Sequence, residues 1–440
     1  MKIAICGYGI EGQSSYNYFN DGLNEVVICD ESTFIDAPEE AVTRLGKNCF
    51  NDLNEFDLVI RSAGLQPSKL LDASSGINEK ITTQLNLFLS TCMSNNLIGI
   101  TGTKGKGTTS SLIAKMLKAS NKQVLLGGNI GVPMLDLLSR VSEETYVVLE
   151  LSSFQLIDLR GKPPSLAVCL MVVPEHLNWH KDLSEYIEAK SNMFTHQSSE
   201  DTVVFFEDNE LSSQIAQKSP GKHVPYFKQP GAYIEGNVII IDDQVICKTS
   251  ELKLLGKHNW QNVCAAITTV WQIDQNVEAI RSVATNFGGL EHRLELAGEI
   301  EGVKYYDDSF GTTPETAIVA IETFAVPEVI IVGGSDKGVP YEPLVQAIVN
   351  GNVKAAICIG ETGQHIYELI EANKGTKQIR LQLMPIGSTM ADIVEAAKSQ
   401  SENGDVVILS TGSASFDMFN NYKDRGEQFK ACIQSLARAV

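Results

Sequence analysis

A glycine-rich segment with two lysines, GITGTKGKGTTSSL, occupies residues 99–112 and has the composition of a loop that holds phosphate groups. Backbone N–H groups in such a loop and the positive end of the helix that follows it attract an anion. Lys106 is predicted to reach the terminal phosphates of a nucleotide. Gly107 departs from the usual pattern, in which a Ser or Thr that helps to hold Mg²⁺ follows the Gly-Lys pair. The first hydroxyls come at Thr108 and Thr109, so this is either an active nucleotide-using enzyme with a variant loop or a protein that only binds.

An acidic residue, Glu150, interrupts an otherwise apolar predicted strand in VVLELSSFQL. A buried carboxylate is costly unless it is paired or bound to a metal, and Mg²⁺ prefers a few carboxylates, waters and phosphates. Glu150 is therefore predicted to be a Mg²⁺ ligand, with a hydrogen-bonded buried glutamate as the alternative. His176 directly follows a strand, at the edge where ligands of parallel sheets bind. Lys190 falls on the next helix, and His180 is expected at the surface.

The N-terminal segment GYGIEG matches the pattern G-x-G-x-x-G between a strand and a helix, with Gly7, Gly9 and Gly12 at the glycine positions. Asp30 ends the second predicted strand, about where an acid that binds a ribose would lie. The turn is predicted to hold a nucleotide or another phosphorylated ligand, and a tight turn without a ligand is the alternative.

Further polar loops follow predicted strands or begin predicted helices. Asn259 and Asn262 in GKHNWQN have helical spacing and could either cap the helix or hold an adenine through its donor–acceptor edge. The other segments are EHRLE, DDSFGTT, GGSDKG and STGSASFDMFNNYKDRGEQF. Each is unremarkable alone, and their shared place at strand ends suggests one site.

The elements that position these residues alternate strand, glycine turn and helix, which predicts an α/β protein with parallel sheets. We expect three α/β domains in series, at residues 1–93, 94–288 and 289–440. Residues 221–257 alternate apolar and polar positions between Gly and Asp turns, so they are predicted to add antiparallel strands to the central domain. The paired glycines in NFGGLEHR mark the expected hinge before the third domain.

The chain has 440 residues, of which 43% are apolar, and a formal net charge of -19. This balance excludes a general nucleic-acid binder, because no basic excess exists to neutralise phosphates. Nine cysteines lie mostly in apolar runs without a C-x-x-C pair, which favours buried free thiols in a reducing cytoplasm. No apolar run could span a bilayer, and the short apolar start is predicted to be a strand rather than a signal peptide. We expect a cytoplasmic protein with no nucleic-acid or membrane partner.

Taken in order, these segments resemble the Mur ligases: GTKGKGTT, GGNIGVP, LELSSFQL, EHLNWH, EAKSNMF, GKHNWQN, EHRLE, DDS, GGSDKG and SAS…RGEQF. The resemblance spans the whole chain, and LELSSFQL and the C-terminal segment are its most discriminating parts. It implies a Rossmann-like N-terminal domain that binds a UDP substrate, a central P-loop ATPase-like domain with the small antiparallel addition, and a Rossmann-like C-terminal domain that binds an amino acid.

The same resemblance implies ATP-dependent amide formation in peptidoglycan precursor synthesis. A substrate carboxylate attacks the γ-phosphate, and the incoming amine displaces phosphate from the resulting acyl phosphate. Two Mg²⁺ ions and nearby cations are expected to stabilise the charge. The substrates implied by the most similar member are UDP-N-acetylmuramoyl-L-alanine and D-glutamate, and the enzyme is expected to be a monomer.

Site residues carry over motif by motif. The residues implied to carry the chemistry are Lys106, Glu150, His176, Lys190 and Arg293. Those implied to bind ATP are Gly102, Thr103, Lys104, Gly105, Lys106, Gly107, Thr108, Asn259, Asn262, Arg293 and Asp308. Those implied to bind the UDP substrate are Gly9, Ile10, Glu11, Asp30, Glu31 and Asn129. Those implied to bind the amino acid are Thr312, Lys337, Ser415 and Tyr422. The implied metal ligands are Glu150, His176, Lys190 in carbamylated form and, for the missing hydroxyl, Thr108.

Three positions depart from the family pattern. Gly107 replaces a Ser or Thr, Phe310 stands where a lysine is usual, and Tyr422 stands where a phenylalanine is common. A charge-assisted contact is worth about 1.5–3 kcal/mol, so the missing cation at Phe310 could cost about tenfold to a hundredfold. Two alternatives stay open: a Mur-type ligase for another amino acid such as L-glutamate, and a nucleotide-binding pseudoenzyme. Folylpolyglutamate synthases lack the N-terminal domain, and amidotransferase-associated relatives carry a cysteine zinc ribbon that is absent here.

Overall fold

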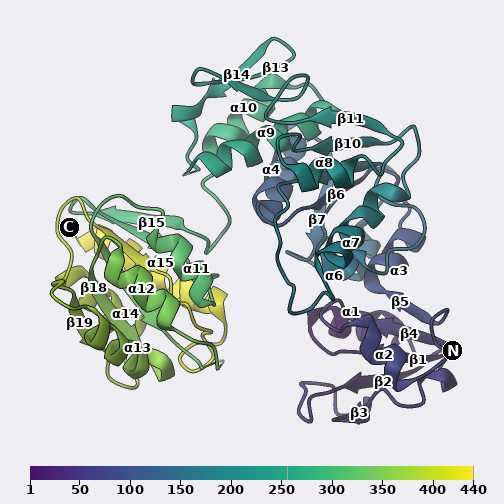
Figure 1. Ribbon diagram of the computed structural model, residues 1–440, viewed down its shortest axis with the longest axis horizontal. Coiled ribbons are helices and arrows are strands. Elements are labelled where there is room, and N and C mark those ends of the chain that lie inside the picture. Colours follow the sequence, from purple (N-terminus) through teal and green to yellow (C-terminus); the bar gives the residue numbers. More distant parts are fainter. Residues whose placement is uncertain (255, 337, 440) are drawn as a thin grey trace. The chain divides into compact units, whose positions relative to one another are not determined.

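The structure is a computed structural model that describes residues 1–254, 256–336 and 338–439. It divides into two compact units, Met1–Phe287 and Gly288–Val440, which are described separately (Figure 1). The boundary falls inside NFGGLEHR, the segment where the hinge is predicted. The division into three domains stays a prediction, because residues 1–287 form one compact unit that contains two parallel sheets.

The first sheet of the N-terminal unit has five parallel strands in the order β3-β2-β1-β4-β5. The strands are β1 (Lys2–Cys6), β2 (Glu25–Asp30), β3 (Val42–Leu45), β4 (Leu58–Arg61) and β5 (Ile81–Thr83), and the helices are α1 (Ile10–Phe19), α2 (Pro67–Ala73) and α3 (Gln84–Thr91). The apolar runs of β1, β2 and β4 are buried, as parallel strands covered on both faces require. The predicted α/β start of the chain is confirmed.

The second sheet has six parallel strands in the order β11-β10-β9-β6-β8-β7. The strands are β6 (Leu97–Thr101), β7 (Val124–Gly128), β8 (Tyr146–Glu150), β9 (Leu166–Cys169), β10 (Thr202–Phe205) and β11 (Lys222–Pro225). The helices are α4 (Lys106–Ala119), α5 (Met134–Leu137), α6 (Ser153–Leu156), α7 (Leu183–Thr195), α8 (Glu210–Ala216), α9 (Lys257–Trp271) and α10 (Val277–Asn286). The central strand β6 leads directly into the predicted phosphate loop and α4.

The predicted antiparallel addition is confirmed for part of its range. Strands β12 (Tyr233–Glu235), β13 (Val238–Ile241) and β14 (Gln244–Lys248) form a three-stranded antiparallel sheet. The prediction was wrong for the start of the range, because β11 pairs in parallel with β10 as the edge of the main sheet. Lys222 and His223 at its start are exposed, and this polarity hid an edge strand.

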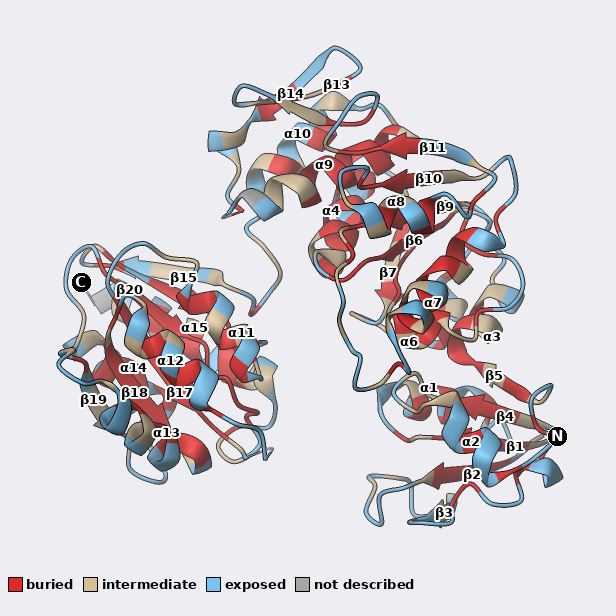
Figure 2. Ribbon diagram, viewed as in Figure 1, coloured by how far each residue is buried: buried red, intermediate tan, exposed pale blue. Residues whose placement is uncertain are grey.

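The C-terminal unit contains a six-stranded sheet in the order β15-β16-β20-β17-β18-β19. Its strands are β15 (Glu295–Ile300), β16 (Val303–Asp307), β17 (Glu328–Gly333), β18 (Val353–Ile359), β19 (Arg380–Leu383) and β20 (Val406–Leu409), and its helices are α11 (Pro314–Ile321), α12 (Glu342–Asn350), α13 (Gly360–Asn373), α14 (Met390–Ser399) and α15 (Tyr422–Ala439). Strand β15 is antiparallel to β16 and the other pairs are parallel. Figure 2 shows buried strands inside each unit and exposed outer faces of the helices.

The cysteines follow the sequence prediction, since all nine are free thiols; Cys92 and Cys432 are partly buried and the other seven are buried. Among the described helices, none combines the length and the apolar character needed to cross a bilayer.

Candidate active site

The predicted phosphate loop joins β6 to α4, and its conformation depends on glycine. Gly102 (φ 143°) and Gly105 (φ 88°) occupy the region that favours glycine. A Cβ on Gly105 would collide with the Asn262 side-chain oxygen, so α9 packs directly against the loop. Because α4 begins at Lys106, the free backbone N–H groups of its first turn lie at the loop, where an anion is favoured.

Some side chains of the loop hydrogen-bond to the protein, and one of them, Lys104, faces solvent. Thr103 Oγ1 donates to the Val173 carbonyl (3.0 Å) and lies 2.8 Å from the Tyr186 hydroxyl, so it ties the loop to the neighbouring strand end. Lys106 Nζ donates to the carbonyls of Gly102 (3.1 Å) and Thr103 (2.9 Å), while Lys104 is exposed. The loop therefore presents one cation to solvent and holds a second against its own backbone.

The two threonines after Gly107 differ in access. Thr109 is fully buried, and its hydroxyl has no hydrogen-bond partner among the residues that the structure describes. Thr108 is only partly buried, in the first turn of α4. Of the two hydroxyls that could replace the one missing at Gly107, that of Thr108 is the accessible one.

Glu150 ends β8 and is 3% exposed. Its Oε1 accepts a hydrogen bond from Asn129 Nδ2 (2.8 Å), whereas its Oε2 is buried and unpartnered within the described part of the chain. A carboxylate with one oxygen used and one free matches the predicted metal ligand better than a fully satisfied buried glutamate.

Lys190 lies on α7 and is 2% exposed. Its Nζ donates to the Gly102 carbonyl (2.8 Å) and lies over the Tyr186 ring at 4.7 Å from the centroid. Burial and, next, repulsion by Lys106 lower the pKa of Lys190 to about 7, against weaker attraction by groups that include Glu150. The predicted residues Lys106, Glu150 and Lys190 are thus brought close enough for their charges to interact.

His176 has a left-handed backbone (φ 59°) and an exposed side chain. Its ring centroid lies 4.8 Å from that of Phe154, and partial desolvation by such neighbours lowers the pKa of the imidazole. Glu175, 3.5 Å away, opposes this shift, whereas Lys106 and Lys190 add to it. A neutral imidazole is the form that binds a metal. The structure therefore places His176 within the same electrostatic neighbourhood as the phosphate loop.

The prediction that His180 lies at the surface was wrong. His180 is 2% exposed; its Nε2 lies 2.9 Å from Ser153 Oγ and its Nδ1 lies 3.2 Å from Glu185 Oε2. It packs between Trp179 and Tyr186. Ser153 lies 27 positions away in the sequence, and this distant contact together with α7 buries a residue that its own polar neighbours suggested would be exposed.

At the predicted UDP site, Gly9 and Ile10 are exposed at the start of α1, with Ile10 75% exposed. Both oxygens of Asp30 accept backbone N–H groups, from Tyr8 (2.7 Å) and Ser32 (2.8 Å). Asp30 therefore shapes the glycine turn itself, as well as ending β2 beside it.

Two further residues predicted at the UDP site have protein partners. Glu11 accepts hydrogen bonds from Ala63 N (2.9 Å) and Gln155 Nε2 (2.6 Å), which link the first sheet to α6. Glu31 pairs with Lys69 at 2.5 Å on the surface.

Asn259 and Asn262, predicted near adenine, lie in the first turns of α9. Asn262 Nδ2 donates to Asn259 Oδ1 (3.0 Å), and the oxygen of Asn262 packs against Gly105. The structure thus brings this pair to the phosphate loop.

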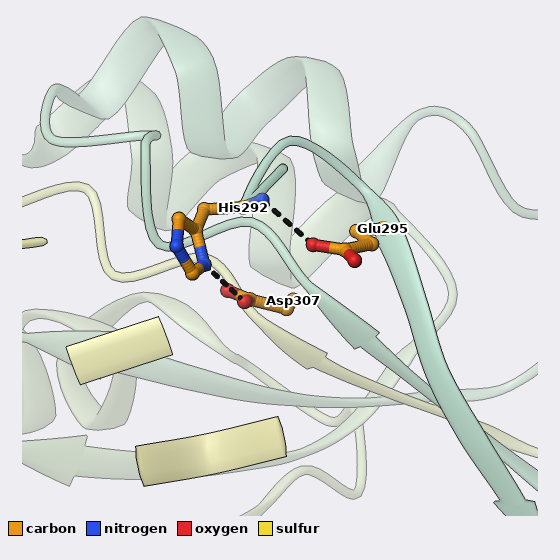
Figure 3. Close-up of side chains that lie close together, drawn as sticks. All are labelled: His292, Glu295 and Asp307. Atoms are coloured by element: carbon orange, nitrogen blue, oxygen red, sulfur yellow. Dashed lines mark hydrogen bonds and ion pairs between the residues drawn. The ribbon is translucent and has the colours of Figure 1, made fainter. Parts of the chain in front are cut away.

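In the C-terminal unit, the DDSFGTT and EHRLE loops meet. Asp308 accepts hydrogen bonds from Leu294 N (3.1 Å) and Ser410 Oγ (2.6 Å), and burial raises its pKa to about 6. Arg293, within the EHRLE loop, is exposed. His292 Nδ1 lies 2.7 Å from Asp307 Oδ2, and Figure 3 shows this pair beside Glu295.

Of the predicted glutamate-binding residues, Thr312 and Tyr422 are partly buried and Ser415 is 2% exposed. Lys337 lies outside the described residues. Arg425, which sequence reasoning did not single out, is fully buried and donates to Ser309 Oγ and Ser309 O, each at 2.8 Å. It joins the DDSFGTT loop to α15; the RGEQF motif was its only sequence signal.

Two protein-family models match parts of this chain. Residues 100–270 match the Mur ligase middle domain, and residues 292–413 match the Mur ligase, glutamate ligase domain. UDP-N-acetylmuramoylalanine–D-glutamate ligase of Clostridium kluyveri is 36% identical over 402 residues, covering 89% of this chain and 86% of its own. The ligase of the same name from Clostridium tetani is 34% identical, covering 99% of this chain and 97% of its own.

Solved structures share the fold at low sequence identity. UDP-N-acetylmuramate-alanine ligase MurC from Thermotoga maritima superposes with a TM-score of 0.57 and 18% identity, covering 99% of both chains. MurF ligase from Thermotoga maritima, solved in complex with ADP, gives a TM-score of 0.56 with 16% identity, covering 99% of this chain and 94% of its own.

Proposed function

The chain belongs to the Mur ligase family, and from this premise we propose that it joins D-glutamate to UDP-N-acetylmuramoyl-L-alanine in an ATP-dependent step of peptidoglycan precursor synthesis. The observation that carries the proposal is the buried Glu150, which has one oxygen held by Asn129 and the other unpartnered among described residues, beside the phosphate loop. The names of relatives that match nearly the whole chain support D-glutamate as the amino acid.

The proposed reaction has two steps. The L-alanine carboxylate of the UDP substrate attacks the γ-phosphorus; a carboxylate O–P bond forms, the bond to the β-phosphate breaks, and ADP leaves. The D-glutamate amine then attacks the acyl carbon, a C–N bond forms, the C–O bond to phosphate breaks, and the amine releases a proton. Negative charge gathers on the phosphoryl group in the first step, so cations at the loop, with Lys106 foremost, are the main source of stabilisation.

The residues present fit Mg²⁺. Glu150 offers a buried carboxylate oxygen without a protein partner among the described residues, and His176 offers an imidazole whose pKa burial lowers. Thr108 supplies the accessible hydroxyl near the start of α4. When bound, Mg²⁺ would supply positive charge for the phosphate oxygens. We expect two ions, with Lys190 in carbamylated form as the ligand of the second.

Carbamylation of Lys190 is supported by its surroundings. Burial and Lys106 favour the neutral amine near pH 7, which is the form that attacks CO₂. An N–C bond forms, one proton leaves, and the product is an anionic carbamate. The modification would replace an amine, which when protonated repels Lys106, with an anion that attracts Lys106 and can bind a metal.

The remaining assignments follow the family motifs and stay proposals. Asn259 and Asn262 hold the adenine, and Arg293 and Asp308 also bind ATP. The glycine turn at Gly9 and Ile10, with Glu11, Asp30, Glu31 and Asn129, holds the UDP substrate. Glutamate is held by Thr312, Lys337, Ser415 and Tyr422.

The test is phosphate release by the purified full chain with ATP, Mg²⁺ and UDP-N-acetylmuramoyl-L-alanine, comparing D-glutamate, L-glutamate and no amino acid. Release that needs D-glutamate, with the product mass confirmed, supports the proposal. Release that needs L-glutamate would mean that the mechanism is the same but the amino-acid substrate is L-glutamate. The departures at Phe310 and Tyr422 are the reason for testing this second candidate. Nucleotide binding without release from any amino acid would mean that the chain only binds.

A further inference from the structure

Arg293 rests on an aromatic ring. Its guanidinium carbon lies 5.2 Å from the centroid of Phe310, a separation at which a cation is attracted to the ring face. The ion pairs nearest to it along the loop are made by a different cation, Lys430, with Glu291 and Glu295. Arg293 is exposed and attracts the nearby Asp308 carboxylate, and its contact with Phe310 places the guanidinium against a ring face.

The Phe310 ring is itself held by Tyr422. The two rings meet edge to face, with centroids 5.4 Å apart and planes at 88°, the geometry that aromatic pairs prefer. Tyr422 also lies edge to face with His292, at 6.2 Å and 84°. The two residues at which this chain departs from the family pattern in the C-terminal unit are therefore in contact with each other.

The backbone fixes the position of the platform formed by Phe310 and Tyr422. Phe310 N donates to the carbonyl of His292 (2.9 Å), and Ser309 Oγ donates to the carbonyl of Tyr422 (2.8 Å). The buried Arg425 donates twice to Ser309. The platform cannot shift without breaking several of these hydrogen bonds.

The loop that carries Arg293 is fixed as well. His292 (φ 60°) and Leu294 (φ 44°), on either side of Arg293, have left-handed backbones, a strained conformation for such side chains. Asp307 holds the His292 ring, and Glu295 accepts the His292 backbone N–H at 2.9 Å (Figure 3). The backbone of Arg293 and the Phe310 ring beneath its guanidinium group are therefore both held in place.

We propose that Phe310 is a positioning residue, whose ring face holds the Arg293 guanidinium in one orientation for an anionic group of the nucleotide. The inference rests on the proposed function, in which Arg293 binds ATP. A carboxylate partner would use N–H donors of Arg293, whereas a ring face leaves the N–H groups at the edge of the guanidinium plane available for phosphate oxygens. Holding a flexible side chain in place before binding also reduces the freedom lost on binding.

The proposal explains how a ring can stand where a lysine is usual. A lysine at position 310 would repel Arg293, while Phe310 orders it without adding charge. The chain thus keeps one ordered cation at this place, where the family pattern has two.

The test compares Phe310→Leu, which keeps an apolar side chain and removes the ring, with Phe310→Tyr, which keeps the ring. Both are made in the full chain, alone and together with Arg293→Ala, and kcat and KM for ATP are measured. We expect Phe310→Leu to lower kcat/KM for ATP about three- to tenfold and Phe310→Tyr to restore most of it. In the Arg293→Ala background, Phe310→Leu should have no further effect, because Phe310 acts through Arg293.

A contact readout separates this proposal from the proposed function. In NMR spectra of the full chain with isotopically labelled arginine, the Phe310 ring current should shift the Arg293 side-chain resonances. Phe310→Leu should abolish this shift, whereas Phe310→Tyr should keep it. If the chain releases no phosphate with any amino acid, the proposed function fails, and the resonances together with ADP affinity still test Phe310. Equal losses from Phe310→Leu with and without Arg293, or no loss at all, would overturn the positioning role.

Discussion

Asn129 Nδ2 donates a hydrogen bond to Glu150 Oε1 across 2.8 Å and so directs the two oxygens of one carboxylate to different tasks. Oε1 is fixed by the β7–α5 loop, and Oε2 is left for a ligand, since it is buried without a partner in the described ranges. The residue predicted to contact the UDP-sugar thus orients the residue predicted to bind Mg²⁺. Substitution of either residue should therefore alter KM for both ATP and the UDP substrate.

Glu150→Gln tests the charge of this carboxylate. The amide has the same shape and keeps an oxygen for Asn129, but it loses the negative charge that a cation requires. We expect kcat to fall about a hundredfold or more and the Mg²⁺ concentration needed for half-maximal rate to rise, both measured by phosphate release. The exposed Glu143→Gln is the control for loss of charge. Unchanged Mg²⁺ dependence in an active Glu150→Gln variant would contradict the metal role.

Gly105→Ala tests the packing of α9 against the phosphate loop. Gly105 has φ 88°, and its Cβ would collide with Asn262, so the loop must move. We expect KM for ATP to rise about tenfold or more, with KM for the UDP substrate less affected. Gly161→Ala is a matched control, because Gly161 has φ 87° with nothing within 4 Å of the added Cβ. Equal effects of the two substitutions would show that backbone strain alone is responsible.

Lys190 should make activity depend on CO₂ in a pH-dependent way. Burial and Lys106 lower its pKa to about 7, so the neutral amine, which reacts with CO₂, becomes more abundant as pH rises through that value. Protein stripped of CO₂ and bicarbonate should lose activity and regain it on addition, faster at about pH 8 than at about pH 6 when the dissolved CO₂ concentration is kept equal. A carbamate resonance from labelled bicarbonate, absent in Lys190→Met, would identify the site. Full activity of the stripped protein without that resonance would exclude carbamylation.

Glu328 should limit stability at alkaline pH. It is fully buried at the start of β17, neither of its carboxylate oxygens has a described partner, and burial raises its pKa to about 8. The folded state therefore binds a proton that the unfolded state has released above about pH 4.5. The stability due to this proton is fully present below about pH 4.5 and is lost as pH rises through about 8.

Glu328→Gln should remove this loss. In thermal denaturation between about pH 5 and about pH 9, the variant should gain on the wild-type protein as pH rises. Glu368→Gln, at an exposed site on α13, serves as the control. A constant difference between Glu328→Gln and wild type across the range would mean that Glu328 does not titrate as expected.

Much of the fold could be predicted from the sequence, because buried parallel strands are continuous apolar runs. The runs that form β1, β2 and β8 are predicted as strands on this basis. The edge strand β15 was not, since the burial pattern of ELAGEI has a single fully buried residue. β19 likewise has the half-polar sequence RLQL and no fully buried side chain. An edge strand is determined by its one neighbour, which its own composition does not reveal.

The site was predictable where a motif is local and unpredictable where partners are distant in sequence. The phosphate loop and Glu150 were found from a dozen neighbouring residues each. The burial of Arg61 could not be predicted in this way, because its partner Asp158 (2.6 Å) lies 97 positions away in the sequence. The contact of Phe310 with Tyr422 was equally hidden, so two departures from the family pattern looked independent when they form one structure.

One backbone oxygen, the carbonyl of Gly102, accepts hydrogen bonds from both Lys106 and Lys190. The oxygen has two lone pairs and accepts both bonds at once, so a change at one lysine alters the surroundings of the other. Carbamylation would give Lys190 a negative charge, which would attract the Lys106 ammonium group away from the carbonyl oxygens that it now contacts. The position of Lys106 would then depend on the supply of a dissolved gas before any nucleotide binds, so protein purified without that gas and protein in a cell would bind ATP with different affinity.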